Sequence, residues 1–138
     1  MLSIDTARAL AAVGVVWEPQ AGDRFAIESV NLRDEVFWIS DLTIELHHYH
    51  DQAVLGFNGT TEWALDSVSL DQARWLPRED QLRELIGDRL VSLTRTPDGW
   101  DVVIDNAGAR TRHTHHDAEE AYAAALLAIT HAAVDVGR

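Results

Sequence analysis

Residues 90–115 read "LVSLTRTPDGWDVVIDNAGARTRHTH", and this stretch decides the fold. Two apolar runs flank the turn sequence "TPDG", in which Asp98 and Gly99 mark a reversal of the chain. A third strand, residues 110–115, is expected after the loop sequence "NAGA". The stretch therefore predicts antiparallel strands that follow one another along the chain.

The segment after these strands predicts the longest helix. Asp117 is expected to cap it, and Glu120, three residues later, gives an acidic variant of the capping box. Apolar residues then recur at helical spacing in a stripe formed by Tyr122, Leu126, Ile129 and Ala133. Alanines beside that stripe would let the helix lie close against a sheet.

A central helix is expected on the N-terminal side of the same strands. The sequence "WLPREDQLRELIGDRL", residues 75–90, places Pro77 in a first helical turn and Gly87 at the helix end. Its buried stripe is expected to contain Leu82, Leu85 and Ile86.

A short N-terminal helix is expected as well. Ser3 is a suitable N-cap, and Gly14 is a plausible residue for the turn that ends the helix. The apolar positions between them, at helical spacing, are Ile4, Ala7, Leu10 and Ala11.

Strand-like segments fill the region between the first two helices, at residues 24–29, 35–40 and 42–50. In the last of these, apolar and polar residues alternate with the period of a half-buried strand. Extending that alternation places His48 and His50 on the apolar face. If the strand ends at Leu46, the preferred interpretation, these histidines are loop residues.

Residues 53–68, "AVLGFNGTTEWALDSV", predict a hairpin with its turn at Asn58-Gly59. Both turn residues tolerate positive φ, which makes the pair a strong hairpin signal. The alternative is a short helix capped by Thr60 or Thr61.

The order helix, strands, helix, strands, helix predicts the α+β class. We expect residues 1–138 to form a single α+β domain, an antiparallel sheet on which the N-terminal, central and long C-terminal helices pack. A chain of this length can bury a core of its own.

The composition excludes several classes of function. The 11 basic residues, all arginine, stand against 23 acidic residues, which gives a formal net charge of −12. Phosphate backbones and anionic lipids are repelled by such a surface, so neither nucleic acid nor a membrane is an expected partner. A basic protein partner is possible, whereas scattered carboxylates argue against DNA mimicry. The absence of Cys and of a signal peptide fits a cytoplasmic protein, and the oligomeric state stays open.

Two histidine clusters, "LHHYHD" at 46–51 and "HTHH" at 113–116, raise the question of a metal site. Histidines at i and i+2 on a strand project to one face, so the candidate zinc ligands are His48, His50, His113 and His115. The clusters converge only if their strands are neighbours. In the simpler interpretation they lie near the surface at strand ends, and no cofactor is bound.

No catalytic motif accompanies these clusters. The one glycine-rich stretch, "GFNGTTEW" at 56–63, lacks the lysine of a phosphate-binding loop. The same stretch combines a turn, hydroxyls and an aromatic ring, which suits recognition of a partner. Its candidate partner-binding residues are Asn58, Thr60, Thr61 and Trp63. Trp38, within an apolar run, is expected to fill the core instead.

The segments 56–68, 75–89 and 117–129 resemble a family of small actinobacterial proteins that is often labelled pilus assembly protein CpaE. The region from Trp75 to Gly87, with the C-terminal alanine-rich helix, is also similar to small phage-derived α/β proteins. CpaE-type ATPases need a phosphate-loop lysine, and this chain has no lysine. No site residue carries over from the resemblance.

The sequence therefore predicts a non-enzymatic binding or adaptor module. A histidine-ligated metal-binding protein or metal hydrolase is the alternative, and an acidic inhibitor of a nucleic-acid enzyme is a weaker one.

Overall fold

The computed structural model describes residues 1–28, 35–39, 44–49, 52–57, 67–69 and 72–136. By their contacts these residues group into two compact units. Unit 1 combines residues 1–15 with 77–138, and unit 2 consists of residues 16–76. Unit 2 is thus inserted into the chain between the first helix of unit 1 and the rest of that unit.

The described part of unit 1 has three α-helices, α1 (Ile4–Ala12), α2 (Glu79–Ile86) and α3 (Ala118–Val136). A 3₁₀ turn, η1 (Gly87–Arg89), connects α2 to the strands. As predicted, Gly87 ends α2; its φ of 66° belongs to the left-handed region that favours glycine.

The sheet of unit 1 is the predicted antiparallel meander. Its strands are β7 (Leu90–Thr96), β8 (Gly99–Asn106) and β9 (Ala109–His115), in the order β7-β8-β9. In the first hairpin Thr96 pairs with Gly99, and in the second Asn106 pairs with Ala109. The second hairpin turns through Ala107 and Gly108, both at positive φ, which is the backbone of a type I′ turn.

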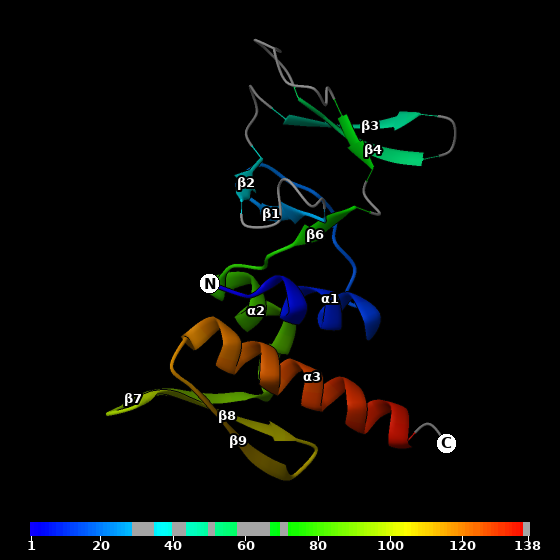
Figure 1. Cartoon of the computed structure of the whole chain (residues 1–138). Helices are drawn as coiled ribbons and strands as arrows, with labels where there is room; N and C mark the ends of the chain where they lie inside the picture. The colour runs from blue at the N-terminus through cyan, green and yellow to red at the C-terminus, as the bar shows by residue number, and fades with distance from the viewer. Residues whose placement is uncertain (29–34, 40–43, 50–51, 58–66, 70–71, 137–138) are drawn as a thin grey trace. The chain divides into compact units, whose positions relative to one another are not determined.

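Helix α3 packs against β8, β9 and the other two helices, and Figure 1 shows it lying along one face of the sheet. Alternation along β8 buries Val102 and Ile104 beneath it. The largest buried apolar side chains of unit 1 are Leu2, Leu10, Leu82, Ile86, Val102, Ile104, Tyr122, Leu126 and Ile129. Leu85, expected in the buried stripe of α2, is instead 38% exposed, because Leu82 and Ile86 occupy the face toward α3.

The N-terminal helix begins as predicted at Ser3, whose Oγ accepts a hydrogen bond from the Thr6 N–H at 3.1 Å. Gly14 follows the helix with a φ of 97°. Ala7 and Leu10 are buried, whereas Ala11 is exposed and is not part of the apolar face.

The described residues of unit 2 form two antiparallel sheets. The first has the order β2-β1-β6 and consists of β1 (Arg24–Ile27), β2 (Val36–Trp38) and β6 (Ala73–Trp75). The second has the order β3-β4-β5 and consists of β3 (Ile44–Tyr49), β4 (Gln52–Phe57) and β5 (Ser67–Ser69). The core of the first sheet is formed by Phe25, Ile27, Ile39 and Ala73, with Trp17 and Phe37 packed against it.

The register of the second sheet tests two predictions about the strands of unit 2. Strand β3 continues past Leu46 to Tyr49, since His47 and His48 pair with β4. The prediction that the strand ends at Leu46 is therefore wrong. Strands β4 and β5 pair antiparallel, as the predicted hairpin requires, with Gly56 opposite Ser67, whereas the turn predicted at Asn58-Gly59 lies outside the described residues.

The α+β class and its N-terminal, central and long C-terminal helices are confirmed. The strands that the structure describes are divided among three antiparallel sheets. In the part of the chain that the structure describes, no helix has the length and apolar character needed to cross a membrane.

Candidate functional site

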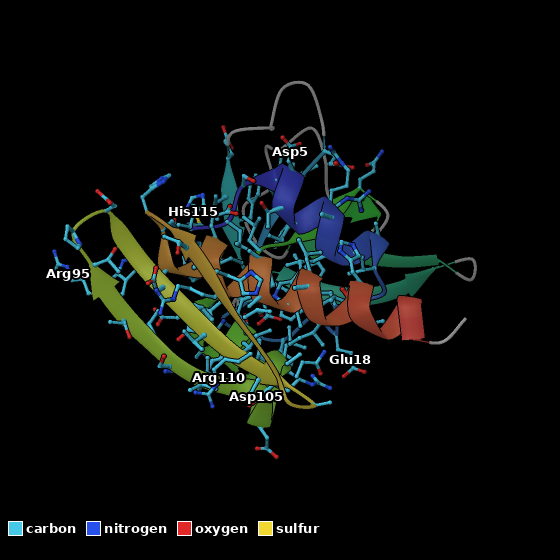
Figure 2. The ribbon with its side chains drawn as sticks, turned by 90° about the horizontal axis from the view of Figure 1, so that it is seen from below. Asp5, Glu18, Arg95, Asp105, Arg110 and His115 are labelled. Atoms are coloured by element: carbon cyan, nitrogen blue, oxygen red, sulfur yellow. The ribbon has the colours of Figure 1, made fainter. Side chains whose placement is uncertain are left out.

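The second histidine cluster lies where β9 leads into α3, and Figure 2 labels His115 at this end of the strand. His113 and His115 pair with Val102 and Trp100 of β8, so both rings lie on the face of the sheet that α3 covers. Their neighbour Thr114 is exposed on the opposite face. The i, i+2 alternation predicted from the sequence is therefore present here.

His115 caps the first turn of α3. Its Nδ1 accepts a hydrogen bond from the Asp117 N–H at 3.0 Å, and its ring stacks on His116 at 4.3 Å between centroids. An Nδ1 that accepts carries no proton, so the neutral ring has its hydrogen on Nε2. Metal binding at Nε2 would move that hydrogen to Nδ1 and remove the cap.

His113 is half-buried, and its Nε2 lies 2.9 Å from the Thr111 hydroxyl. Burial lowers the pKa of the His113 imidazole below its ordinary value. The ring is therefore neutral and hydrogen-bonded at pH 7.

The capping box predicted at α3 is realised only in part. The Asp117 carboxylate accepts from the Glu119 N–H at 2.8 Å, as expected of an N-cap. The Glu120 carboxylate does not accept from the Asp117 N–H, because it accepts from the Ser3 N–H and the Thr6 hydroxyl, both at 2.8 Å. Glu120 thus caps α1 from α3, and His115 takes its expected place at the Asp117 N–H.

The groups around Asp117 stabilise the ionised form of its carboxylate. Burial opposes ionisation, but hydrogen bonds from the Met1 amino group and from the Glu119 and Glu120 N–H groups outweigh it and hold the pKa of Asp117 below its usual range. A negative charge at the N-terminus of α3 also interacts favourably with the helix dipole.

The structure describes three of the four candidate zinc ligands, and these three lie on strands of two different sheets. His48 is on β3 of unit 2, whereas His113 and His115 are on β9 of unit 1, and His50 lies outside the described residues. Within the described ranges no three His, Cys, Asp or Glu side chains are arranged to hold a metal ion.

The predicted partner-binding residues, Asn58, Thr60, Thr61 and Trp63, also lie outside the described residues. The structure shows a different aromatic surface that the sequence interpretation missed. Trp38, expected in the core, is 54% exposed on β2. Alternation explains the error: the neighbours Phe37 and Ile39 take the core face, which turns the intervening Trp38 away from it.

Arg24 holds Trp38 in place. Its guanidinium carbon lies 5.7 Å from the centroid of the indole ring, which is within the range of a cation–π contact. The arginine is 8% exposed, and its Nε donates to the Leu76 carbonyl at 3.2 Å. The tryptophan is therefore an exposed ring on a buried, hydrogen-bonded support.

The turn that precedes β1 is also held by hydrogen bonds to a side chain. Asp23 is buried, and its Oδ2 accepts from the Trp17 indole N–H at 2.9 Å and from the Gln20 N–H at 3.0 Å. Trp17 packs on Phe25 with 5.7 Å between ring centroids. These contacts fix the start of β1, the strand that carries Arg24 and pairs with β2.

Comparison with known proteins gives no relative: no family model, no curated protein and no solved structure matches the chain. The candidate site is therefore defined by its geometry alone.

Proposed function

We propose that the protein is a non-enzymatic binding module and that Trp38, on β2 of unit 2, contacts its partner. The observation that carries this proposal is the exposure of a large aromatic side chain that Arg24 orients from within the unit. Tryptophan and arginine dominate the small sets of residues that supply most of the binding energy at protein interfaces.

The contact between Arg24 and Trp38 should increase the affinity for a partner. A side chain that is already oriented loses little conformational entropy when a partner covers it. Arg24 is fixed by its contact with the Leu76 carbonyl, and its strand is hydrogen-bonded on both sides, to β2 and to β6. The ring is thus presented on a rigid β-sheet, which favours recognition by a preformed surface.

Co-purification from the native host tests the proposal. The full chain and its Trp38→Ala variant are used as bait, and captured proteins are compared by quantitative mass spectrometry. Val16→Ala is the matched control, since it removes another exposed apolar side chain of unit 2, one that is 75% exposed.

We expect at least one protein to be retained by the unchanged chain and by Val16→Ala but depleted about tenfold or more with Trp38→Ala, as for an interface hot spot. Circular dichroism checks that the variants are folded. Equal recovery with all three baits, or no specific recovery with any, contradicts the proposal.

A further inference from the structure

The backbone at the outer edge of β2 is open among the described residues. Strand β2 lies at one end of the order β2-β1-β6. Ile39, just beyond it, donates to the Asp23 carbonyl at 2.9 Å and accepts from the Gly22 N–H at 2.7 Å. Because antiparallel pairing alternates, Phe37 also bonds toward β1, and the N–H and C=O groups of Val36 and Trp38 point outward.

The three residues of β2 themselves carry none of the usual protection against strand addition. Exposed edges in proteins are commonly blocked by lysine, proline or a β-bulge. The sequence of β2 is Val-Phe-Trp, and its pairing with β1 runs without a shift of register from Arg24↔Trp38 to Ala26↔Val36. An extended peptide can therefore pair with the same residues whose side chains include Trp38.

The charge of the chain is concentrated in unit 2. Residues 16–76 contain three arginines against eleven acidic residues, a net charge of −8 out of the total of −12. Two of those arginines interact with side chains of the same unit. Arg24 makes a cation–π contact with Trp38, and the Arg74 guanidinium lies 2.9 Å from the Glu28 carboxylate. The unit therefore attracts cations.

We infer that the partner presents an extended, arginine- or lysine-rich segment that adds as a strand to β2 and places a cationic side chain on the exposed part of the Trp38 ring. This inference rests on the proposed function, since it names the chemistry of the partner at the same site. Main-chain pairing supplies affinity in such strand addition, and alternate side chains supply specificity. The negative field of unit 2 steers the basic segment and repels nucleic acid.

The probe is a capped peptide of alternating valine and arginine, about eight residues long, titrated calorimetrically into the full chain. A peptide with glutamate in place of arginine tests charge, and a peptide with N-methylated valines tests strand pairing. We expect binding of the first peptide only. Its affinity should fall about thirtyfold with Trp38→Ala, the size of a desolvated cation–π contact, and stay unchanged with Val16→Ala.

Hydrogen exchange gives an independent readout of strand addition. The bound peptide should slow exchange at the Val36 and Trp38 amides, whereas the N-methylated peptide should not. Binding that survives both N-methylation and Trp38→Ala would be non-specific attraction and would overturn the inference. Trp38-dependent binding of an oligonucleotide, or self-association that Trp38→Ala abolishes, would also overturn it.

The two proposals fail in different ways. If the valine–arginine peptide does not bind but Trp38-dependent capture from the host persists, only the assigned partner chemistry is wrong. If the capture is also absent, the binding function itself is wrong.

Discussion

At the start of α3, a histidine performs the capping that the sequence assigned to Glu120. The local pattern correctly placed the N-cap at Asp117, because an N-cap depends on residues close in sequence. The role of Glu120 could not be predicted, since its partners Ser3 and Thr6 lie more than a hundred residues away. His115, a candidate metal ligand in the sequence, accepts from the Asp117 N–H.

Replacing this histidine should weaken α3 by a predictable amount. His115→Ala leaves the Asp117 N–H without its acceptor and should lower the free energy of unfolding by about 1 to 2 kcal/mol. His115→Asn keeps an acceptor near the position of Nδ1 and should recover most of that loss. Urea denaturation at pH 7.5 measures both variants, and an asparagine variant no more stable than the alanine variant would refute the capping role.

His113 should make the stability of the protein depend on pH. Its folded-state pKa is lowered by burial from the ordinary 6.5, so below that pH the unfolded chain binds the proton more readily. The contribution is fully present above about 6.5 and is lost as the pH falls toward the lower folded-state pKa.

We therefore expect His113→Gln, which can keep the hydrogen bond to Thr111, to reduce the loss of unfolding free energy between pH 7 and pH 5. Denaturant titrations at the two pH values measure the difference. His131→Gln, at an exposed position on α3, is the matched control. An unchanged pH dependence in the His113 variant would show that this ring does not contribute.

At the scale of elements, Gly99 links the first hairpin of unit 1 to the histidine cluster. Its φ is 145°, and a Cβ built there would lie 2.4 Å from the His115 carbonyl oxygen and from the His116 Cα. Gly108, in the second hairpin, also has a positive φ, of 90°, but no heavy atom lies within 4 Å of its Cβ position.

Gly99→Ala should therefore lower the free energy of unfolding by about 2 to 4 kcal/mol, because backbone strain and collision with the β9 backbone add together. Gly108→Ala, which introduces strain alone, should cost about 1 to 2 kcal/mol. Chemical denaturation of both variants tests this order. Equal losses would mean that the close approach at Gly99 is unimportant.

The success of the sequence prediction differs between elements for a physical reason. The strands β7, β8 and β9 are joined by turns whose residues specify them locally, so their boundaries and order were predictable. Strand β6 pairs with β1, some fifty residues earlier, and no local signal specifies that pairing. Trp38 was wrongly predicted to lie in the core. Its neighbours in the strand are also apolar, so the sequence does not show which residues face the core and which face outward.

At the scale of the whole molecule, the insertion of unit 2 was not apparent from composition or linkers. Unit 1 is completed by α1, which packs on α3 although unit 2 separates the two helices in sequence. The inserted segment carries most of the net negative charge, −8 of −12, because only three of the eleven arginines lie in it. Unit 1 thus has helices, a sheet and a core of its own, and unit 2 carries the candidate binding surface.

Unit 1 should therefore fold without unit 2. Replacing residues 16–76 with a Gly/Ser linker of about twelve residues, which spans roughly 20 Å on average, should leave a chain with cooperative thermal unfolding. A second version that also carries Leu10→Ala, in the buried face of α1, should be less stable by about 2 to 4 kcal/mol. Non-cooperative melting of the first chain would show that unit 1 depends on unit 2.

Site-specific photo-crosslinking in the native host tests the central claim most directly. A benzophenone amino acid is placed at position 38, and in a separate chain at the half-exposed Val91 of unit 1 as the control. After irradiation, we predict a discrete adduct with another protein from position 38 and none from position 91. The absence of an adduct at position 38, or the same adducts from both positions, would contradict a partner-binding surface centred on Trp38.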